Sequence, residues 1–185
     1  GIMFISMQSP MMQDLLILKN PAMNSENLAL AGASLIAISS LFNGIGRFFW
    51  GGTSDRLGRI QVFRLILGSQ IIVFILLMFT SNPYIFGASV CFILLCYGGG
   101  LGAMPGYILD VFQEKLMPVM YGVILTAWSF AGIVGPQVAA FIWDFYTATP
   151  ELIGSKTYLI GITLLSIGFL ITLFLSNKTI ISKNN

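Results

Sequence analysis

Charge is scarce in this sequence. Only 9% of the 185 residues are charged, whereas 56% are apolar, and the mean hydropathy is +0.88. A soluble globular domain carries roughly 25% charged residues. A chain with so few charges cannot cover a water-facing surface, which excludes that class and predicts an all-α, polytopic membrane helix bundle.

Histidine is absent and cysteine occurs twice. The lack of histidine excludes histidine proton relays, histidine metal sites and Ser-His-Asp triads. Cys91 and Cys96 are five residues apart, which puts them on different faces of a helix, so we expect two buried thiols and no mutual disulfide. No glycine-lysine phosphate loop or Lys/Arg block is found. We therefore expect no enzyme chemistry, no metal, no cofactor and no nucleic-acid partner.

Long apolar runs dominate the remaining sequence. A bilayer-spanning helix needs about twenty apolar residues, and five segments meet this length, at 28–52, 62–80, 84–109, 118–143 and 158–176. Residues 1–12 are too short to span and have no basic region ahead of them, so they are expected to be the second half of a helix in a fragment. We predict connections at 13–27, 81–83, 110–118 and 144–157, and a polar tail at 177–185.

Basic residues are distributed unequally between alternate loops. One set of loops carries only Lys19 and Lys156. The other set carries six basic residues, namely Arg56, Arg59, Arg64, Lys115, Lys178 and Lys183. Because cytoplasmic loops are enriched in Lys and Arg, this asymmetry predicts that the loop at 51–59 and the C-terminus are cytoplasmic.

Arg47 is the only charge deep inside an apolar segment. It precedes Asp55 by eight residues, so it lies about 12 Å deeper along a helix. A charge near hydrocarbon costs at least ~2.5 kcal/mol, so such a residue usually faces a bundle interior or a water-filled path. It is either a carboxylate-binding group or a structural arginine that reaches the headgroups or a carboxylate. One polar stripe contains Ser40, Asn43, Arg47, Gly51 and Ser54.

Two later segments also carry candidate site residues. Residues 97–107 read YGGGLGAMPGY, a composition that allows either close helix packing or gating flexibility. Tyr97 either offers its hydroxyl to a ligand or packs. Trp128 lies near the middle of its span, away from the interfaces where tryptophan is commonest, so it lines a cavity or anchors in lipid. No Asp or Glu lies in a span centre, which favours exchange or uniport over proton coupling.

The turn GGTSDRLGR at 51–59 resembles the G-x-x-x-D-R-x-G-R loop of the major facilitator superfamily of secondary transporters. Four stretches in order resemble its oxalate/formate antiporter family: MQSPMMQD (7–14), NGIGRFFWGGTSDRLGR (43–59), CYGGGLGAMPGYILDVF (96–112) and MYGVILTAWSFAGIVGP (120–136). The resemblance implies the C-terminal half of a twelve-helix carrier. Residues 1–12 would belong to helix 7 and the five spans would be helices 8 to 12.

The resemblance also implies exchange of small carboxylates across a plasma (inner) membrane by alternating access. The partners would be a small organic anion, the lipid bilayer and a missing N-terminal six-helix half. Arg47 matches the arginine expected to bind the substrate carboxylate. The other expected substrate-binding residues are Asn43, Gln8, Tyr97 and Trp128. The residues expected to act in gating are Asp55, Arg56, Gly58 and Arg59.

One departure from the family pattern narrows the expected substrate. Oxalate-carrying members are expected to place a second cation where this chain has Trp128. A single arginine suits a monocarboxylate such as formate, lactate or pyruvate better than oxalate. Two alternatives remain: a major facilitator carrier for another solute class, with Arg47 structural, and a non-transporting truncated membrane module.

Overall fold

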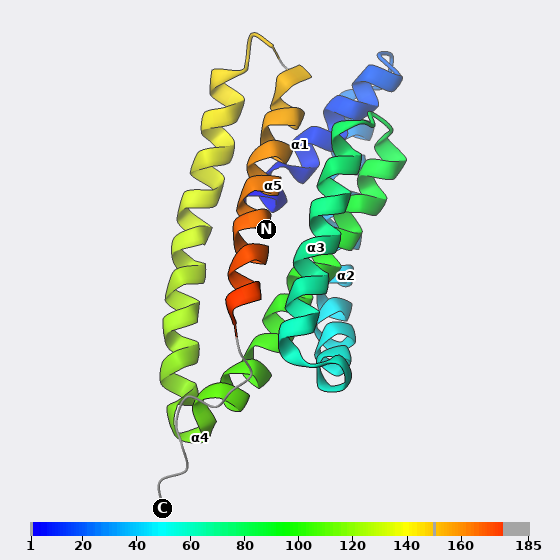
Figure 1. The fold of residues 1–185 in the computed structure, drawn as a ribbon. Coiled ribbons are helices and arrows are strands. Elements are labelled where there is room, and N and C mark those ends of the chain that lie inside the picture. Colours follow the sequence, from blue (N-terminus) through cyan, green and yellow to red (C-terminus); the bar gives the residue numbers. More distant parts are fainter. Residues whose placement is uncertain (1, 150, 176–185) are drawn as a thin grey trace, which may run out of the picture.

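The computed structural model describes residues 2–149 and 151–175, and all the regular structure in them is α-helical. The predicted all-α membrane bundle is therefore confirmed. Figure 1 shows the helices arranged as a bundle of elongated rods. They are α1 (Ile2–Lys19), α2 (Ser25–Leu57), α3 (Arg59–Met78), α4 (Pro83–Phe145) and α5 (Glu151–Phe174).

Helix α4 contributes two antiparallel rods. In Figure 1 its green first arm descends, turns at the lower end and continues as a yellow second arm. Counted this way, five segments in the described residues are long and apolar enough to cross a membrane, and each overlaps one predicted span. They are Ser25–Leu57, Arg59–Met78, Pro83–Phe112, Glu114–Phe145 and Leu152–Phe174. The chain is an integral, multi-pass membrane protein.

The helices are longer than the apolar runs that predict them. Helix α1 continues to Lys19, so Asp14 is helical, although the sequence predicts a loop at 13–27. Residues 110–118 are helical within α4, and α5 begins at Glu151, where a connection to residue 157 is expected. Polar residues end an apolar run, but most of them do not end a helix. Residue 176 and the predicted tail at 177–185 lie outside the described residues.

A single glycine separates α2 from α3. The sequence predicts a polar turn over 51–59, but α2 continues through Leu57 and α3 begins at Arg59. Gly58 has φ +93°, and its N–H donates to the Ser54 carbonyl oxygen at 3.1 Å. This conformation strains any residue that has a Cβ. The motif therefore forms a one-residue break between two helices.

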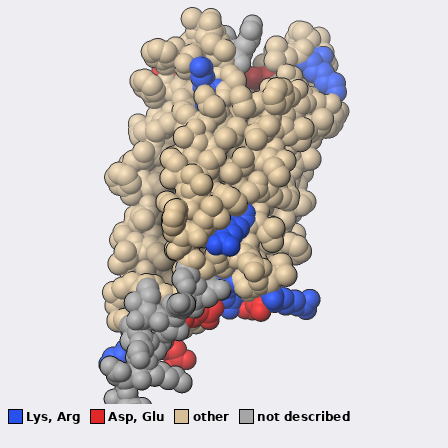
Figure 2. Space-filling model, viewed as in Figure 1, with Lys and Arg blue, Asp and Glu red and all other residues tan. Residues whose placement is uncertain are grey.

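The core forms where α1, α3, α4 and α5 meet. The ring of Phe4 contacts those of Phe74, Phe86 and Tyr158. Cys91 and Cys96 are free and buried, which confirms the prediction for both thiols. Figure 2 shows charged side chains gathered at the two ends, with a mostly uncharged band between them that contains one basic patch. This distribution fits a bundle whose middle faces lipid or other helices.

Candidate functional site

Close contact between α2 and α4 fixes the position of Arg47. A Cβ built at Gly98 would lie 2.0 Å from the Asn43 carbonyl oxygen, and one at Gly102 would lie 2.5 Å from that of Arg47. On α2, a Cβ at Gly46 would lie 2.0 Å from the Leu95 carbonyl oxygen. Backbones approach this closely only where the intervening side chain is missing. The glycines of 97–107 thus provide the expected close packing at Gly98 and Gly102.

Arg47, Tyr97 and Trp128 come together from three rods. The Tyr97 hydroxyl belongs to the first arm of α4, whose Gly98 and Gly102 pack against the α2 backbone at Asn43 and Arg47. The indole N–H of Trp128, on the second arm, donates a hydrogen bond to the same hydroxyl. The Arg47 side chain is exposed and forms no salt bridge with any described residue. The arrangement combines a permanent positive charge with an oriented hydroxyl group.

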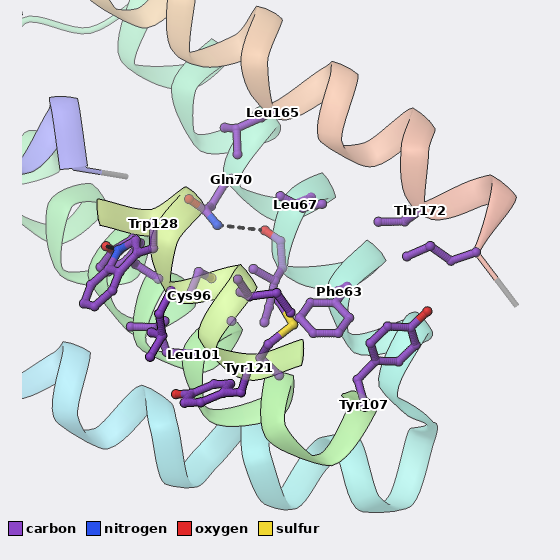
Figure 3. A pocket seen from close by; sticks show the side chains of 17 residues that line it. Phe63, Leu67, Gln70, Cys96, Leu101, Tyr107, Tyr121, Trp128, Leu165 and Thr172 are labelled. Carbon is purple, nitrogen blue, oxygen red and sulfur yellow. Dashed lines mark hydrogen bonds between the residues drawn. The ribbon is translucent and has the colours of Figure 1, made fainter. Parts of the chain in front are cut away.

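Tyr97 and Trp128 also line a cavity of about 440 Å³ between α3, both arms of α4 and α5. Figure 3 shows Phe63, Leu67 and Leu165 directed toward this cavity from α3 and α5. None of the described residues that line it is charged, and Arg47 is not among them. Trp128 is therefore part of the wall of a cavity whose other polar lining residues, among them Gln70 and Tyr121, are uncharged.

Gln8 and Asn43 occupy helix interfaces. Gln8 is 3% exposed, and its side-chain oxygen accepts a hydrogen bond of 3.0 Å from the Ser39 hydroxyl across the α1–α2 interface. It does not line the cavity. Asn43 lies against Gly98, and its Oδ1 is buried with no hydrogen-bond partner among the described residues. Asn43 is one helical turn from Arg47 on α2. Gln8 belongs to α1 and contacts α2 at Ser39, farther from Arg47 than Asn43 is.

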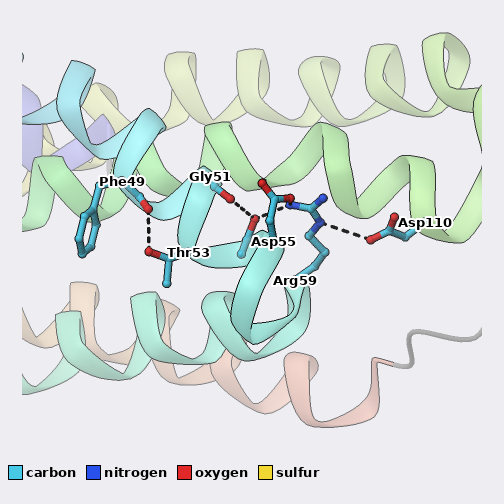
Figure 4. Close-up of polar contacts among 7 residues, drawn as sticks. Phe49, Gly51, Thr53, Asp55, Arg59 and Asp110 are labelled. Carbon is cyan, nitrogen blue, oxygen red and sulfur yellow. Dashed lines mark hydrogen bonds and ion pairs between the residues drawn. The ribbon is translucent and has the colours of Figure 1, made fainter.

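Arg59 connects three helices at one end of the bundle. Its Nη1 lies 2.6 Å from an Asp55 carboxylate oxygen and donates to the Ser54 hydroxyl at 2.5 Å. Its Nε donates to the Asp110 carboxylate at 3.3 Å (Figure 4). The guanidinium lies over Gly106, where a Cβ would come 2.5 Å from Cζ. Arg59 therefore links the end of α2 and the start of α3 to the first arm of α4.

The sequence as a whole also matches a known family. The model of the Major Facilitator Superfamily matches residues 2–136. The chain belongs to the Major Facilitator Superfamily. This is a family of membrane transporters, and the resemblance based on the loop at 51–59 is confirmed.

Several curated proteins are similar to this superfamily member. The oxalate:formate antiporter of Oxalobacter formigenes is 29% identical over 156 residues, which cover 81% of the chain and 37% of that protein. The Na(+), Li(+), K(+)/H(+) antiporter of Planococcus maritimus is 27% identical over 63% of the chain and 28% of its own length. ZINC INDUCED FACILITATOR-LIKE 1 of Arabidopsis thaliana is 29% identical over 53% of the chain and 21% of its own length.

The chain thus spans 37% or less of the length of these relatives. No solved structure matches it. The match to the oxalate:formate antiporter supports the narrower resemblance based on the four stretches. Within the superfamily, the chain is most extensively matched here to an antiporter whose name gives two carboxylates as substrates.

Two contacts of Arg59 were not predicted from the sequence. Asp110 is the partner of Arg59 from 51 residues away, and Gly106 forms the surface under its guanidinium. The sequence signal for these contacts was Asp110 at the end of an apolar run, with Gly106 and Gly102 one and two helical turns before it. Within the described residues, no group of His, Cys, Asp and Glu side chains is suited to hold a metal ion.

Proposed function

We propose that this chain is the C-terminal half of a secondary transporter that carries or exchanges small monocarboxylates by alternating access. The observation that carries the proposal is the position of Arg47, which packs against Gly102 on the same arm of α4 as Tyr97, the hydrogen-bond partner of Trp128. Similarity to the oxalate:formate antiporter over 81% of the chain supports it.

The proposed site matches the chemistry of one carboxylate group. A guanidinium presents planar donors that pair with both carboxylate oxygens. The Tyr97 hydroxyl accepts a hydrogen bond from Trp128, so its own proton remains available for a substrate oxygen. A cation at this position would be repelled by Arg47. A second carboxylate group would face the uncharged cavity walls, which disfavours oxalate.

The proposed conformational cycle uses the Arg59 end of the bundle. The contacts of Arg59 with Asp55 and Asp110 hold α2, α3 and α4 in one arrangement. Alternating access requires an element with two arrangements, and release of these contacts would permit the second. We place Gly58 at the pivot of this end and Arg56 on its exposed surface. We place this end and the C-terminus in the cytoplasm, with a six-helix N-terminal half as the opposite wall of the site.

Uptake assays of the full-length protein test this proposal. Proteoliposomes would be given labelled formate, lactate and oxalate, with the parent protein and the Arg47→Lys and Arg47→Ala variants. We expect Arg47→Ala to abolish monocarboxylate uptake, and Arg47→Lys to retain a fraction, because an ammonium keeps the charge but not the planar pair of donors. Lys19→Ala serves as the control for loss of a positive charge elsewhere.

The outcomes separate the roles of Arg47. A folded Arg47→Ala protein that transports as well as the parent would show that Arg47 is structural. If no carboxylate moves under any gradient, the proposed substrate class is wrong and other solutes must be tried.

A further inference from the structure

We propose that the cavity between α3, α4 and α5 holds the apolar body of the transported monocarboxylate. The substrate is then an alkyl or aryl carboxylate considerably larger than formate. This inference rests on the proposed function, because it needs a carboxylate bound at Arg47. It adds a binding site for the other end of the substrate.

The size and lining of the cavity exclude a small ion as its occupant. Its volume of about 440 Å³ lies in the range of pockets that bury a small organic molecule, roughly 300–1,000 Å³. The walls include Phe63, Leu67, Met104, Leu125 and Leu165, and no described lining residue is charged. A carboxylate inside would have no charged partner, which is strongly unfavourable. The cavity therefore suits the uncharged part of a ligand.

The polar edge of the cavity points to an amphipathic ligand. Tyr97 and Trp128 are joined by a hydrogen bond and both line the cavity. Arg47 packs against Gly102 on the same arm of α4 as Tyr97, although Arg47 itself lies outside the lining. A carboxylate held by Arg47 and Tyr97 can therefore direct its substituent past the two rings into the cavity (Figure 3).

The cavity has walls on four rods of the described part of the chain. Its described walls come from α3, both arms of α4 and α5, and Arg47 on α2 packs against the first arm of α4 at Gly102. A neutral lipid tail could also fill apolar space, but it would leave the charge of Arg47 and the Tyr97 donor without a partner. We therefore assign the cavity to the substrate, and competition by a neutral chain is an outcome of the test.

Gly100 offers a way to fill the cavity selectively. It lines the cavity, and a Cβ built there meets no heavy atom within 4 Å. In Gly100→Phe the ring can enter the cavity without displacing a helix. Gly122→Phe is the matched control, because a Cβ at Gly122 also meets nothing within 4 Å and Gly122 does not line the cavity.

The measurement is the half-saturation concentration for exchange in proteoliposomes containing the full-length protein. The substrates are straight-chain carboxylates from formate to octanoate, together with phenylacetate. For the parent and Gly122→Phe, we expect the half-saturation concentration to fall about fourfold for each methylene that the cavity buries. For Gly100→Phe, we expect this gain to disappear, so that long acids lose their advantage over short ones.

Two results would overturn the inference and leave the proposed function standing. The first is a half-saturation concentration in the parent that is equal for short and long acids, or a loss of exchange in Gly100→Phe that is equal for all acids. The second is competition by neutral alkyl amides of the same length that is as strong as that of the acids, both in the parent and in Arg47→Lys, which would assign the cavity to a lipid tail. Exchange of no carboxylate of any length would instead overturn the proposed function, and the inference with it.

Discussion

Gly102 on α4 lies directly against the backbone of Arg47 on α2. A side-chain carbon at Gly102 would come 2.5 Å from the Arg47 carbonyl oxygen and 2.9 Å from its Cα. Both atoms belong to a helix backbone and cannot turn aside as a flexible side chain can. The missing side chain at residue 102 therefore sets how close α2 comes to α4 at the proposed carboxylate site.

Gly102→Ala is expected to move Arg47 away from Tyr97. Overpacking of a tight interface costs about 1–3 kcal/mol, so we expect a lower apparent Tm in detergent and at least a tenfold loss of carboxylate exchange. Gly100→Ala is the matched control two residues away, because its added methyl group meets nothing within 4 Å. Equal effects of the two variants would show that this stretch needs glycine for flexibility and not for the contact with Arg47.

Trp128→Phe is expected to weaken substrate binding by freeing the Tyr97 hydroxyl to rotate. A smaller aromatic ring replaces the indole and one hydrogen bond is lost. The lost hydrogen bond alone contributes about 0.5–1.5 kcal/mol, or about two- to tenfold in the half-saturation concentration. If Trp128 acts through Tyr97, adding Trp128→Phe to Tyr97→Phe will have no further effect, and uptake by the double variant measures this. Trp143→Phe is the control, because its indole donates to no described residue. Additive losses from Trp128→Phe and Tyr97→Phe would contradict the coupling.

Hydropathy alone predicts the membrane bundle well but its helix ends poorly. Five apolar segments need no tertiary information, because each must cross the same thickness of hydrocarbon. The ends depend on which residues stop a helix, and most polar residues do not. Asp14 is therefore helical, and α2 and α3 are separated only by Gly58, where φ is positive.

The candidate site could be named from the sequence but not assembled from it. Tyr97 and Trp128 are 31 residues apart, and only the rotation of both arms of α4 brings the indole to the hydroxyl. The partner of Gln8 could not be predicted from the sequence either. A polar residue in an apolar run indicates a site, but its partner Ser39, also 31 residues away, becomes visible only in the fold.

Gly58→Ala is expected to destabilise the α2–α3 connection. The φ of +93° with ψ of 143° lies in a region open almost only to glycine, so a Cβ there costs about 1–3 kcal/mol. Gly52→Ala should raise the free energy of unfolding by about 0.5–1 kcal/mol. Gly52 is exposed within α2, and its added methyl group meets no heavy atom within 4 Å. Apparent Tm values in detergent measure both. A stable Gly58→Ala protein would show that the break can relax into a continuous helix.

Arg59→Gln and Asp110→Asn are expected to change the transport rate far more than the stability. Both carboxylate partners of Arg59 are more than half exposed, at 63% for Asp55 and 55% for Asp110, and exposed ion pairs contribute about 0–1 kcal/mol. An ion pair that forms in only one conformation nevertheless shifts the equilibrium between two conformations. We expect a several-fold change in exchange rate and an apparent Tm within a few degrees of the parent.

Ionic strength and a matched charge variant test whether the change in exchange rate comes from the contact of Arg59 with Asp110. Raised ionic strength screens exposed pairs, so it should move the parent toward the behaviour of Arg59→Gln and leave that variant nearly unchanged. Lys115→Gln removes the same charge from an exposed position in the turn of α4 and should exchange as the parent does. If Lys115→Gln matched Arg59→Gln in rate and in salt response, the general charge at this end of the bundle, and not the contact of Arg59 with Asp110, would control exchange.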